Sequence, residues 1–383
     1  MSHQIKELII FANGDPRKAA TWSNVPCCLV RELEHRGITV HTIDLICHPL
    51  EYLYDHFFRR FLCLLLMPLG IYPPYYVRTR LHQWWGERRI RQMVQRYPAA
   101  DYCLFINYLF YNRYNQIPSL LLSDWPTPFD IRRKGRLPSF LDRRVIRQEK
   151  EAISHARHVV SLFKVRAEEM KRDYPDAAVR FIGNAFVNNC YGKPICGEEI
   201  IRKKKQSKIL LFIGKSDRYR QAAQLLIDTL RQLHEEEPQR KLQLHIIGID
   251  RKMLRIPPSV AVICHGYLHK DDPKEKEEYY RLLIHARIII NPSSGWAAYS
   301  SIVEAMYFYT PVIVSSFDAF VCAFGKEIDF GCYTTPSIED LTKHIRYLCD
   351  TSDYPALSMR AHQRVENDTC QLFVSKMIRL IQS

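Results

Sequence analysis

The sequence lacks the patterns that mark several common protein classes. Its twelve cysteines stand singly or as the adjacent pair Cys27 and Cys28, and none forms a Cys-x-x-C motif. A disulfide framework needs regular spacing in a small secreted domain, so we expect reduced thiols in a cytoplasmic protein. The chain also has no P-loop, no Asp-x-Asp motif, no serine-hydrolase elbow and no His/Cys cluster at metal-ligand spacing. We therefore predict neither a metal site nor a cofactor.

Long apolar runs are also missing. The run Phe61–Val77 is short for a membrane span, and Pro68, Pro73 and Pro74 interrupt it, so we predict that it does not cross a bilayer. The N-terminal stretch MSHQIKELIIFANGD has no basic region followed by an apolar core and a small-residue cleavage site. We therefore expect a first β-strand there and no signal peptide.

The composition is that of a folded protein with a basic balance. Of 383 residues, 47% are hydrophobic and 25% are charged, which favours globular folding over disorder. The length favours two domains, because one domain usually takes roughly 100 to 200 residues. Lys and Arg number 55 against 41 Asp and Glu, a formal net charge of +14. This excess favours an anionic partner: a phosphorylated small molecule, an acidic membrane face or nucleic acid.

The same order of local patterns occurs twice along the chain. Residues 6–12, KELIIFA, predict a short buried strand, residues 25–37 have helical spacing that ends at a Gly, and residues 38–44, ITVHTID, predict a second strand. This order is typical of a parallel βαβ unit with helices on the sheet faces. It restarts at residue 208 with KILLFIG, a helix over 222–236 and the strand KLQLHIIG. The sequence therefore predicts an α/β protein with two doubly wound parallel-sheet domains.

Two further segments belong to this picture. The basic run 200–208, IIRKKKQSK, has no apolar periodicity, and we interpret it as the linker between the domains. The apolar strand at 286–290 is followed by NPSSGWAAYSS. In doubly wound sheets ligands bind outside the carboxyl ends of the strands, so this stretch is a candidate binding loop.

That stretch carries a family resemblance. NPSS (291–294), Ser-x-x-Glu-Ala-Met (301–306) and TPVIVS (310–315) resemble the donor-binding signature of family-4-type glycosyltransferases, also called glycosyl transferases group 1. That family has the GT-B fold, in which two Rossmann-like domains face a cleft. KILLFIGKSDRYRQAAQLLIDTL and VICHGYL are similar to family segments and occur in the family's order. The resemblance spans nearly the whole chain and is clearer in the second half.

The resemblance implies a set of donor-binding residues. In this metal-independent fold, basic side chains and the positive end of a helix stabilise the leaving diphosphate. A carboxylate accepts two charge-assisted hydrogen bonds from the ribose hydroxyls, which is the role that falls to Glu304. The matching positions are Gly14, Lys215, Arg220, Leu268, Trp296, Ser300, Ser301 and Glu304.

Two observations leave alternatives open. Ser301 to Glu304 also reads as a capping box, in which Glu304 would bond only the backbone of its own helix. The family usually has a second Glu where this chain has Trp296, and often a Gly where it has Tyr309. Trp296 fits stacking on a sugar or acceptor ring, packing in its loop, or loss of catalysis. A nucleotide-sugar-binding pseudoenzyme and a GT-B sugar-nucleotide epimerase are therefore alternatives to a transferase.

The resemblance also implies a catalytic residue in the first half. Asp124 follows the apolar stretch SLLLS, where the family often presents a His or an Asp. A carboxylate there could act as the base for the acceptor hydroxyl or stabilise the developing sugar cation. The alternative is that Asp124 only starts a turn before Pro126. The resemblance favours a retaining mechanism.

Residues 51–97 combine the apolar run with eight arginines and three acidic residues. Arginines interleaved with aromatic residues are typical of the lipid interface, so we predict that Arg88, Arg89 and Arg91 face an anionic membrane. The alternative is an arginine-rich helix pair that faces water. Single-strand nucleic-acid binders have a similar composition, but no recognisable nucleic-acid module accompanies it, and we predict no nucleic-acid partner.

These observations together predict a GT-B glycosyltransferase of the hexosyltransferase type. Residues 1–195 would form the acceptor-binding domain, residues 207–350 the nucleotide-sugar-binding domain, and residues 351–383 helices that pack back towards the first domain. The predicted partners are a nucleotide-sugar donor and a glycan or lipid-linked acceptor in bacterial-type surface polysaccharide biosynthesis. The expected location is the cytoplasm, at the inner face of the membrane.

Overall fold

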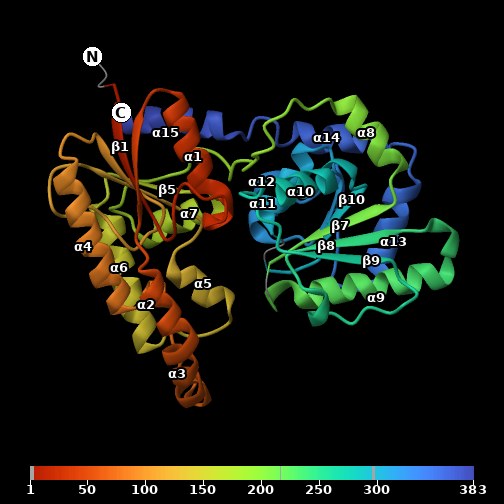
Figure 1. Cartoon of the computed structure of the whole chain (residues 1–383), viewed down its shortest axis with the longest axis horizontal. Helices are drawn as coiled ribbons and strands as arrows, with labels where there is room; N and C mark the ends of the chain where they lie inside the picture. Colours follow the sequence, from red (N-terminus) through yellow and green to blue (C-terminus); the bar gives the residue numbers. More distant parts are fainter. Residues whose placement is uncertain (1–3, 216, 296–297) are drawn as a thin grey trace. The chain divides into compact units, whose positions relative to one another are not determined.

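The structure is a computed structural model that describes residues 4–215, 217–295 and 298–383. The chain divides into two compact units. Unit 1 runs to Asn184 and includes the segment from Cys370 to Ser383, and unit 2 is Ala185–Thr369. Each unit has one six-stranded parallel sheet flanked by helices (Figure 1). The predicted α/β class with two doubly wound sheets is confirmed.

The sheet of unit 1 has the strand order β2-β1-β3-β4-β5-β6, and every neighbouring pair is parallel. Its strands are β1 Glu7–Ala12, β2 Thr39–Asp44, β3 Tyr102–Phe105, β4 Ser119–Ser123, β5 His158–Ser161 and β6 Val179–Arg180. The strands predicted at 6–12 and 38–44 are therefore confirmed as β1 and β2. β1 is buried from Leu8 to Ala12, because a parallel strand is covered on both faces.

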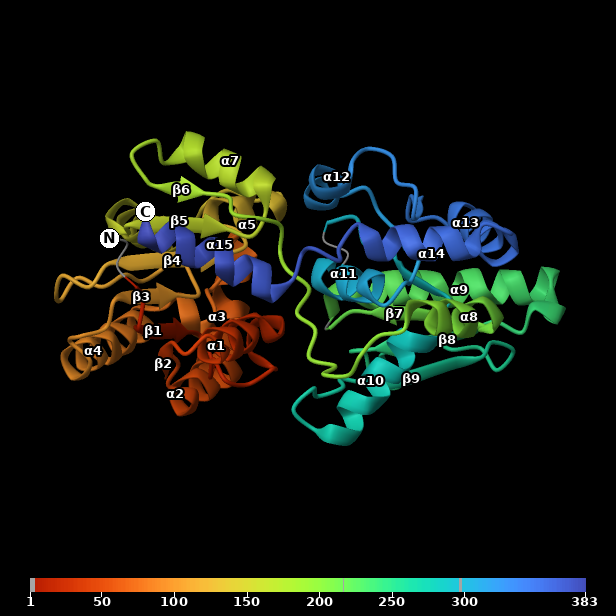
Figure 2. The ribbon, with the colours of Figure 1, turned by 90° about the horizontal axis from the view of Figure 1, so that it is seen from above.

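The helices of unit 1 include one from the far end of the chain. They are α1 Val25–His35, α2 His48–Leu53, α3 Arg59–Leu66, α4 Arg80–Arg96, α5 Thr127–Arg133, α6 Phe140–His155, α7 Lys164–Asp173 and α15 Cys370–Gln382. The predicted helix at 25–37 is α1, which ends shortly before Gly37, whose φ of 78° suits a glycine. α15 packs on α1 (Figure 2), and Arg36 Nη2 donates to the carbonyl oxygen of Gln371 over 2.7 Å.

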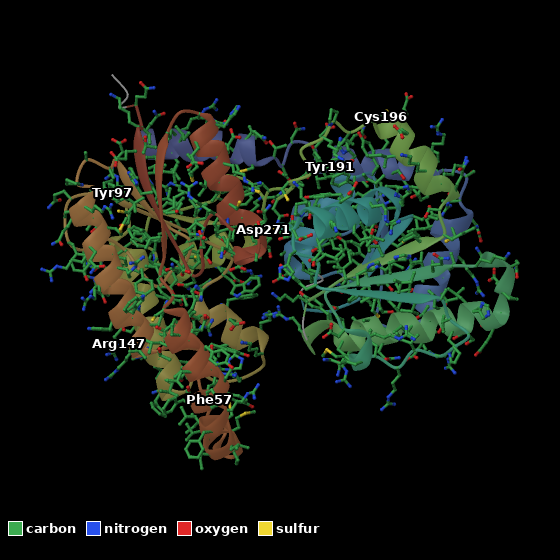
Figure 3. All side chains as sticks on the ribbon, in the orientation of Figure 1. Phe57, Tyr97, Arg147, Tyr191, Cys196 and Asp271 are labelled. Atoms are coloured by element: carbon green, nitrogen blue, oxygen red, sulfur yellow. The ribbon has the colours of Figure 1, made fainter. Side chains whose placement is uncertain are left out.

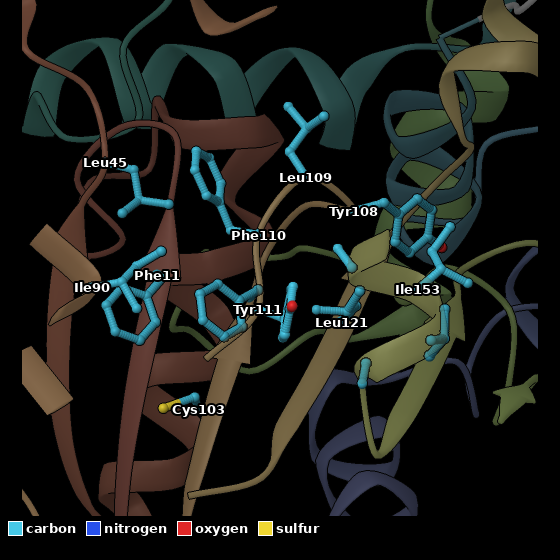
Figure 4. Packing of buried hydrophobic residues seen from close by; sticks show 14 of the residues in the cluster. Phe11, Leu45, Ile90, Cys103, Tyr108, Leu109, Phe110, Tyr111, Leu121 and Ile153 are labelled. Carbon is cyan, nitrogen blue, oxygen red and sulfur yellow. The ribbon is translucent and has the colours of Figure 1, made fainter. Parts of the chain in front are cut away.

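The core of unit 1 lies between its sheet and its helices. Phe11 of β1 stacks on Phe105 of β3 with their ring centroids 4.7 Å apart. Leu121 of β4 and Ile153 of α6 belong to the same buried cluster (Figure 4). This packing fixes the ends of the strands from which the predicted site residues of unit 1 continue.

Unit 2 repeats the architecture with the strand order β12-β11-β10-β7-β8-β9. Its strands are β7 Ile209–Ile213, β8 Gln243–Ile247, β9 Val262–Gly266, β10 Ile288–Asn291, β11 Val312–Val314 and β12 Gly331–Tyr333. Its helices are α8 Gly197–Gln206, α9 Arg220–Glu236, α10 Pro273–His285, α11 Tyr299–Tyr307, α12 Asp318–Phe324, α13 Ile338–Asp350 and α14 Tyr354–Gln363. The predicted strand at 208–214 and helix at 222–236 are confirmed as β7 and α9.

The prediction of a solvated linker at residues 200–208 is wrong. Most of this run belongs to α8, which buries Ile200, Ile201 and Lys204 within unit 2. The run looked solvated because five of its nine residues are basic, but one lysine in it is buried.

Lys204 is fully buried and has a hydrogen-bond acceptor for each of its three protons. Its Nζ donates to the carbonyl oxygens of Leu283 and Ala286, the second at 2.9 Å, and to Thr310 Oγ1 at 2.8 Å. All three acceptors are neutral, and burial lowers the pKa of Lys204 well below its usual value. The lysine therefore joins α8 to the end of α10 and to the segment before β11.

Replacement of Lys204 by Met should lower the free energy of unfolding by about 2–4 kcal/mol, because three buried oxygen atoms lose their donor. Lys205→Met is the control, since Lys205 is exposed on the same helix, and it should change the free energy by less than about 0.5 kcal/mol. Urea titration followed by circular dichroism measures both. Similar small changes in the two variants would contradict a stabilising role for Lys204.

Candidate active site

The chain of unit 2 winds in opposite directions from two neighbouring strands. From β7 it continues to β8 and β9 on one side, and it then crosses to β10, on the other side of β7, and on to β11 and β12. Ligands of doubly wound sheets bind at the carboxyl ends of the strands at such a switch point. The predicted donor segments that follow β7 and β10 both lie there.

Hydrogen bonds hold the loop after β10 against the two adjacent strands. The buried Asn291 donates through Nδ2 to the carbonyl oxygen of Ile213, the last residue of β7, and accepts through Oδ1 from the amide of Ser293, both over 3.2 Å. Ser315, which follows β11, donates through Oγ to the carbonyl oxygen of Ser293. The polar Asn-Pro-Ser-Ser sequence thus fixes this loop at the junction of three strands.

A cavity of about 390 Å³ lies between the loops that follow β7 and β10. An exposed arginine, Arg218, meets two serines there, which suits an anionic group such as a phosphate. Arg218 was not predicted from the sequence, although it lies between the predicted residues Lys215 and Arg220. The lining includes Arg218, Gln221, Pro292, Ser293, Ser294 and Gly295.

The predicted donor residues Lys215 and Leu268 come from adjacent parts of this edge. Lys215 is the second residue after β7, and its Nζ lies 4.3 Å from the ring centroid of Tyr267, which directly follows β9. This cation–π contact holds the exposed ammonium group near the carboxyl ends of the strands. Leu268 is the next residue and is half-buried. Arg220 is the first residue of α9 and is exposed.

Glu304 lies in a buried polar cluster on α11, where it is 1% exposed. Lys270 Nζ donates to both of its carboxylate oxygens, at 2.9 and 2.7 Å. Tyr280 Oη donates to Oε1 at 2.9 Å and Tyr279 Oη to Oε2 at 2.8 Å. Burial, and next the charge of Glu304, raise the pKa of both tyrosines, so both hydroxyls remain donors. These four bonds occupy the acceptor positions of a carboxylate.

The capping-box alternative for Glu304 is wrong. Helix α11 begins at Tyr299, after Ala298 in a left-handed conformation with φ 51°, so Ser300 and Ser301 are its second and third residues. Ser301 is therefore inside the helix, and the Glu304 carboxylate bonds side chains of α10 and of the loop before it. Lys270, Tyr279 and Tyr280 could not be predicted as partners of Glu304, because no local pattern in the sequence connects them to it.

The residue before Thr310 clarifies one departure from the family. Tyr309 has a φ of 60°, a conformation that glycine adopts at little cost and other residues rarely adopt. A family preference for Gly here thus follows from the backbone. In this chain the Tyr309 ring stacks on His362, with the centroids 4.0 Å apart. The other departure, Trp296, lies outside the described residues.

In unit 1, Asp124 directly follows β4. Its Oδ1 accepts from the amide of Trp125 at 3.0 Å and from Ser123 Oγ at 3.3 Å. Ser161, at the end of β5, donates to its backbone carbonyl over 3.1 Å. Burial raises the pKa of Asp124 to about 6, so the group is ionised at neutral pH yet close to its titration range, as a general base requires.

A second buried carboxylate lies nearby and was also missed. Glu149 of α6 accepts from the amide and the hydroxyl of Thr127, at 2.8 and 2.9 Å. Burial raises the pKa of Glu149 to about 7. The contact holds the start of α5, three residues after Asp124.

Gly14 follows β1 in unit 1, with a φ of 108°. Its amide donates to Asp44 Oδ1 over 2.9 Å, and a Cβ atom at this position would lie 3.0 Å from Thr21 Oγ1. A glycine is therefore required for the loop itself. Its contact with a donor stays a prediction, as does metal-independent chemistry. Among the described residues, no group of three or more His, Cys, Asp or Glu side chains is arranged to hold a metal ion.

Residues 207–351 match the family model of glycosyl transferases group 1. The matched segment includes all six strands of unit 2 and the loops at its switch point. This match confirms the resemblance that the sequence predicted. A search of curated proteins finds no match to the chain.

Solved structures share the fold over most of the chain. Sucrose-phosphate synthase from Thermosynechococcus elongatus is 16% identical with a TM-score of 0.66, and the alignment covers 98% of each chain. WaaG, a glycosyltransferase involved in lipopolysaccharide biosynthesis, is 14% identical with a TM-score of 0.64, over 98% of this chain and 99% of WaaG. S. aureus TarM, solved in complex with UDP, is 14% identical with a TM-score of 0.55 over 78% of this chain. The aligned part spans 59% of TarM. These similarities confirm the GT-B fold.

The contacts of Glu304 predict a strong coupling with Lys270. Lys270→Met and Glu304→Gln should each lower the free energy of unfolding by roughly 3–5 kcal/mol, because each leaves a charged partner without its counter-charge in a buried position. The double variant should lose less than the sum, with a coupling energy of about 1–3 kcal/mol. Lys274→Met, at an exposed neighbour, is the control. Additive losses in urea titrations would contradict the pairing.

Asp124 and Asp130 should affect stability with opposite dependence on pH. The pKa of Asp124 is raised, so the folded state binds the proton more tightly and the stability from this group is lost as the pH rises through about 6. The effect of Asp124→Asn on the free energy of unfolding should therefore differ between the two conditions. Relative to the wild type, the variant should be more stable at pH 8 than at pH 4 by about 1–3 kcal/mol.

Asp130 supplies the opposite case. Burial opposes its ionisation, but hydrogen bonds from Lys134 and Arg133 outweigh that effect, and the pKa of Asp130 is lowered. The ionised Asp130 stabilises the fold above the pKa that this group has in the unfolded chain, and this stabilisation is lost as the pH falls through the lower pKa of the folded state. Asp130→Asn should therefore lower the free energy of unfolding most at pH 8. Denaturant titrations at pH 3, 4 and 8 measure both, and the same pH trend in the two variants would contradict the assignment.

Proposed function

We propose that the protein is a glycosyltransferase that moves a sugar from a nucleotide-sugar donor to a glycan or lipid-linked acceptor. One observation carries this proposal: the segment that matches glycosyl transferases group 1 contains the switch point of unit 2, where a cavity lined by one arginine adjoins a stretch of chain that carries two further basic residues. The basic groups are Lys215, Arg218 and Arg220. They suit the diphosphate of a nucleotide sugar, which carries charge that increases as it leaves.

The proposed reaction is a substitution at the anomeric carbon of the donor sugar. The bond from this carbon to the diphosphate oxygen breaks, and the oxygen keeps the electron pair. Lys215, Arg218, Arg220 and the start of α11, with Ser300 and Ser301, would stabilise the resulting charge. The acceptor oxygen forms the new bond, and its proton goes to a base.

We assign the base, or the stabiliser of the sugar cation, to Asp124. Support comes from its position at the carboxyl end of β4 and from burial, which raises its pKa to about 6. A carboxylate with this pKa accepts a proton more readily than an exposed one and still remains mostly ionised at neutral pH.

Glu304 can bind a ribose only if one of its present hydrogen-bond donors leaves. All four acceptor positions of its carboxylate are in use, so a ribose hydroxyl has to replace a present donor. Lys270 is the best candidate to leave, because its side chain is 14% exposed while Tyr279 and Tyr280 are buried. The freed ammonium group would then face the nucleotide.

The same observation favours a second candidate, a nucleotide-sugar-binding protein that does not transfer the sugar. A Glu304 that is permanently bonded to Lys270 would not serve the ribose, and Trp296 replaces the glutamate that the family uses near the donor sugar. Such a protein would bind the nucleotide sugar at the cavity and its basic side chains but would not transfer the sugar.

For the setting we propose a retaining, metal-independent enzyme of bacterial-type surface polysaccharide biosynthesis that acts in the cytoplasm. The support is the resemblance to the family and the likeness in fold to WaaG, a protein involved in lipopolysaccharide biosynthesis. The acceptor would then be a growing glycan or its lipid-linked form.

The decisive measurement is binding and turnover of UDP-, GDP-, ADP- and CMP-sugars by the whole chain. Lys215→Ala and Arg220→Ala should each weaken binding of the preferred nucleotide about ten- to hundredfold, the loss of a charged hydrogen bond. Arg231→Ala is the control, since Arg231 is exposed on the same helix as Arg220. Calorimetric titration that gives equal affinities for all three variants would contradict the proposed site.

Asp124→Asn separates the two candidate functions. A transferase should lose turnover in this variant and keep the nucleotide affinity of the wild type. If the wild type binds a nucleotide but releases no sugar from any donor, the second candidate holds.

A further inference from the structure

One helical segment of unit 1 buries none of its side chains. α2, a π-helical turn at Tyr54–Phe58 and α3 follow one another without a break, and no residue in them is buried. A helix that packs on a core shows a buried apolar stripe, so this one is not held by the core. In Figure 1, α3 extends away from the sheet of unit 1, and Figure 3 labels Phe57 on this projecting part.

The chain then turns back and braces the base of the helix. The reversal occurs at Gly70, whose φ is 72°. Tyr54 Oη donates to the carbonyl oxygen of Pro74 over 3.2 Å, and the amide of Tyr76 donates to Asp55 Oδ1 over 3.1 Å. We call residues 48–76 the hairpin. Residues 61–71 lie beyond these bracing contacts and are its tip.

The hairpin holds half of the exposed large apolar side chains among the described residues. Leu64 in the tip is 78% exposed. Leu137 in the loop before α6 and Phe140, the first residue of α6, are also exposed, and Arg136 in that loop lies 5.5 Å from the ring centroid of Tyr72. An exposed apolar patch of this kind marks an interaction surface. On the hairpin the exposed residues are Tyr52, Leu53, Phe57, Phe58, Phe61, Leu64, Leu65, Met67, Tyr72 and Tyr75.

Charged residues flank the apolar tip in the sequence but do not occur within it. No residue from Phe61 to Val77 is charged. The arginines that flank this run or lie on α4 are Arg59, Arg60, Arg78, Arg80, Arg88, Arg89, Arg91 and Arg96.

The nearby acidic groups are already bonded within unit 1. Asp55 accepts from the hairpin backbone, Glu51 lies 3.3 Å from His48 Nδ1, and Glu87 accepts from Tyr114 Oη at 2.6 Å. With eight arginines against three acidic residues over 51–97, this part of unit 1 carries a net positive charge beside an apolar tip, which complements an anionic lipid surface.

The dimensions of the tip limit how far it reaches. The helical part from Phe61 to Leu66 is about 9 Å long at 1.5 Å per residue, less than half of a hydrocarbon core of about 30 Å. Among the residues described, no helix is both long and apolar enough to span a bilayer. Pro68, Pro73 and Pro74 have no amide proton, which reduces the cost of bringing the returning backbone towards lipid.

We propose that the hairpin inserts its tip into one leaflet of an anionic membrane and that the arginines at its base contact the headgroups. Tyr72 and Tyr75 then lie at the interface, where amphipathic rings are favoured. Arg88 and Arg91, both exposed on α4, add attraction, while Arg89 is half-buried. The contact does not depend on sugar transfer.

Flotation of the whole chain tests this with phosphatidylcholine vesicles that contain or lack phosphatidylglycerol. The wild type should float with the anionic vesicles. Leu64→Glu combined with Leu65→Glu should weaken binding at least about tenfold, because the tip can no longer enter an apolar layer. Tyr347→Glu is the control, since Tyr347 is similarly exposed in unit 2, at 49% against 53% for Leu65. Arg88→Gln and Arg91→Gln should each weaken binding roughly fivefold.

Three outcomes would overturn the proposal. The first is a wild type that floats with neither kind of vesicle. The second is a tip variant that floats as well as the wild type while its circular dichroism is unchanged. The third is a wild type that sediments as a dimer and does not float, together with a monomeric tip variant, which would assign the hairpin to a second copy of the chain. Nucleotide affinity measured in the tip variant keeps this test separate from the proposed transfer.

Discussion

The hydrogen bond from Asn291 to the carbonyl oxygen of Ile213 joins the two strands from which the chain of unit 2 winds in opposite directions. The candidate site depends on this junction. Parallel strands place all their carboxyl ends on one edge, and the divergence of the connections at β7 and β10 leaves room between the loops. The strand order alone therefore brings three features to one edge of the sheet: the cavity, the basic residues after β7 and the serines after β10.

Buried polar contacts, in addition to apolar packing, hold the helices beside this junction. Tyr279 and Tyr280 tie α10 to Glu304 of α11, and Lys204 ties the end of α10 to α8. Loss of one partner from such a contact destabilises the fold, because a buried charge without its partner costs several kcal/mol of folding free energy. The position of α11, and with it the start of the helix that would face a diphosphate, is therefore linked to the pairing of charged groups elsewhere in unit 2.

The sequence was sufficient for those features that depend on local pattern. Continuous apolar runs such as ILLFI predicted buried parallel strands, and helical spacing predicted α1 and α9, because burial on a sheet face or a helix face repeats along the chain.

Contacts between residues far apart in the sequence leave no repeating pattern from which they could be predicted. Lys204 looked like part of a solvated basic run, yet its acceptors lie about eighty and more residues further along the chain. Glu304 fitted a local capping box, yet its donors come from α10 and the loop before it. Arg218 lies between two predicted residues and was missed because the family pattern has no position for it.

Between His48 and Leu66 the hairpin contributes no buried side chain to the core of unit 1. Substitutions there change little in the packing of the sheet, so the cost to folding that restrains most apolar positions is largely absent. Selection on these residues then acts through whatever surface they meet. This helical segment can therefore vary in sequence while the fold and the edge of the sheet remain the same.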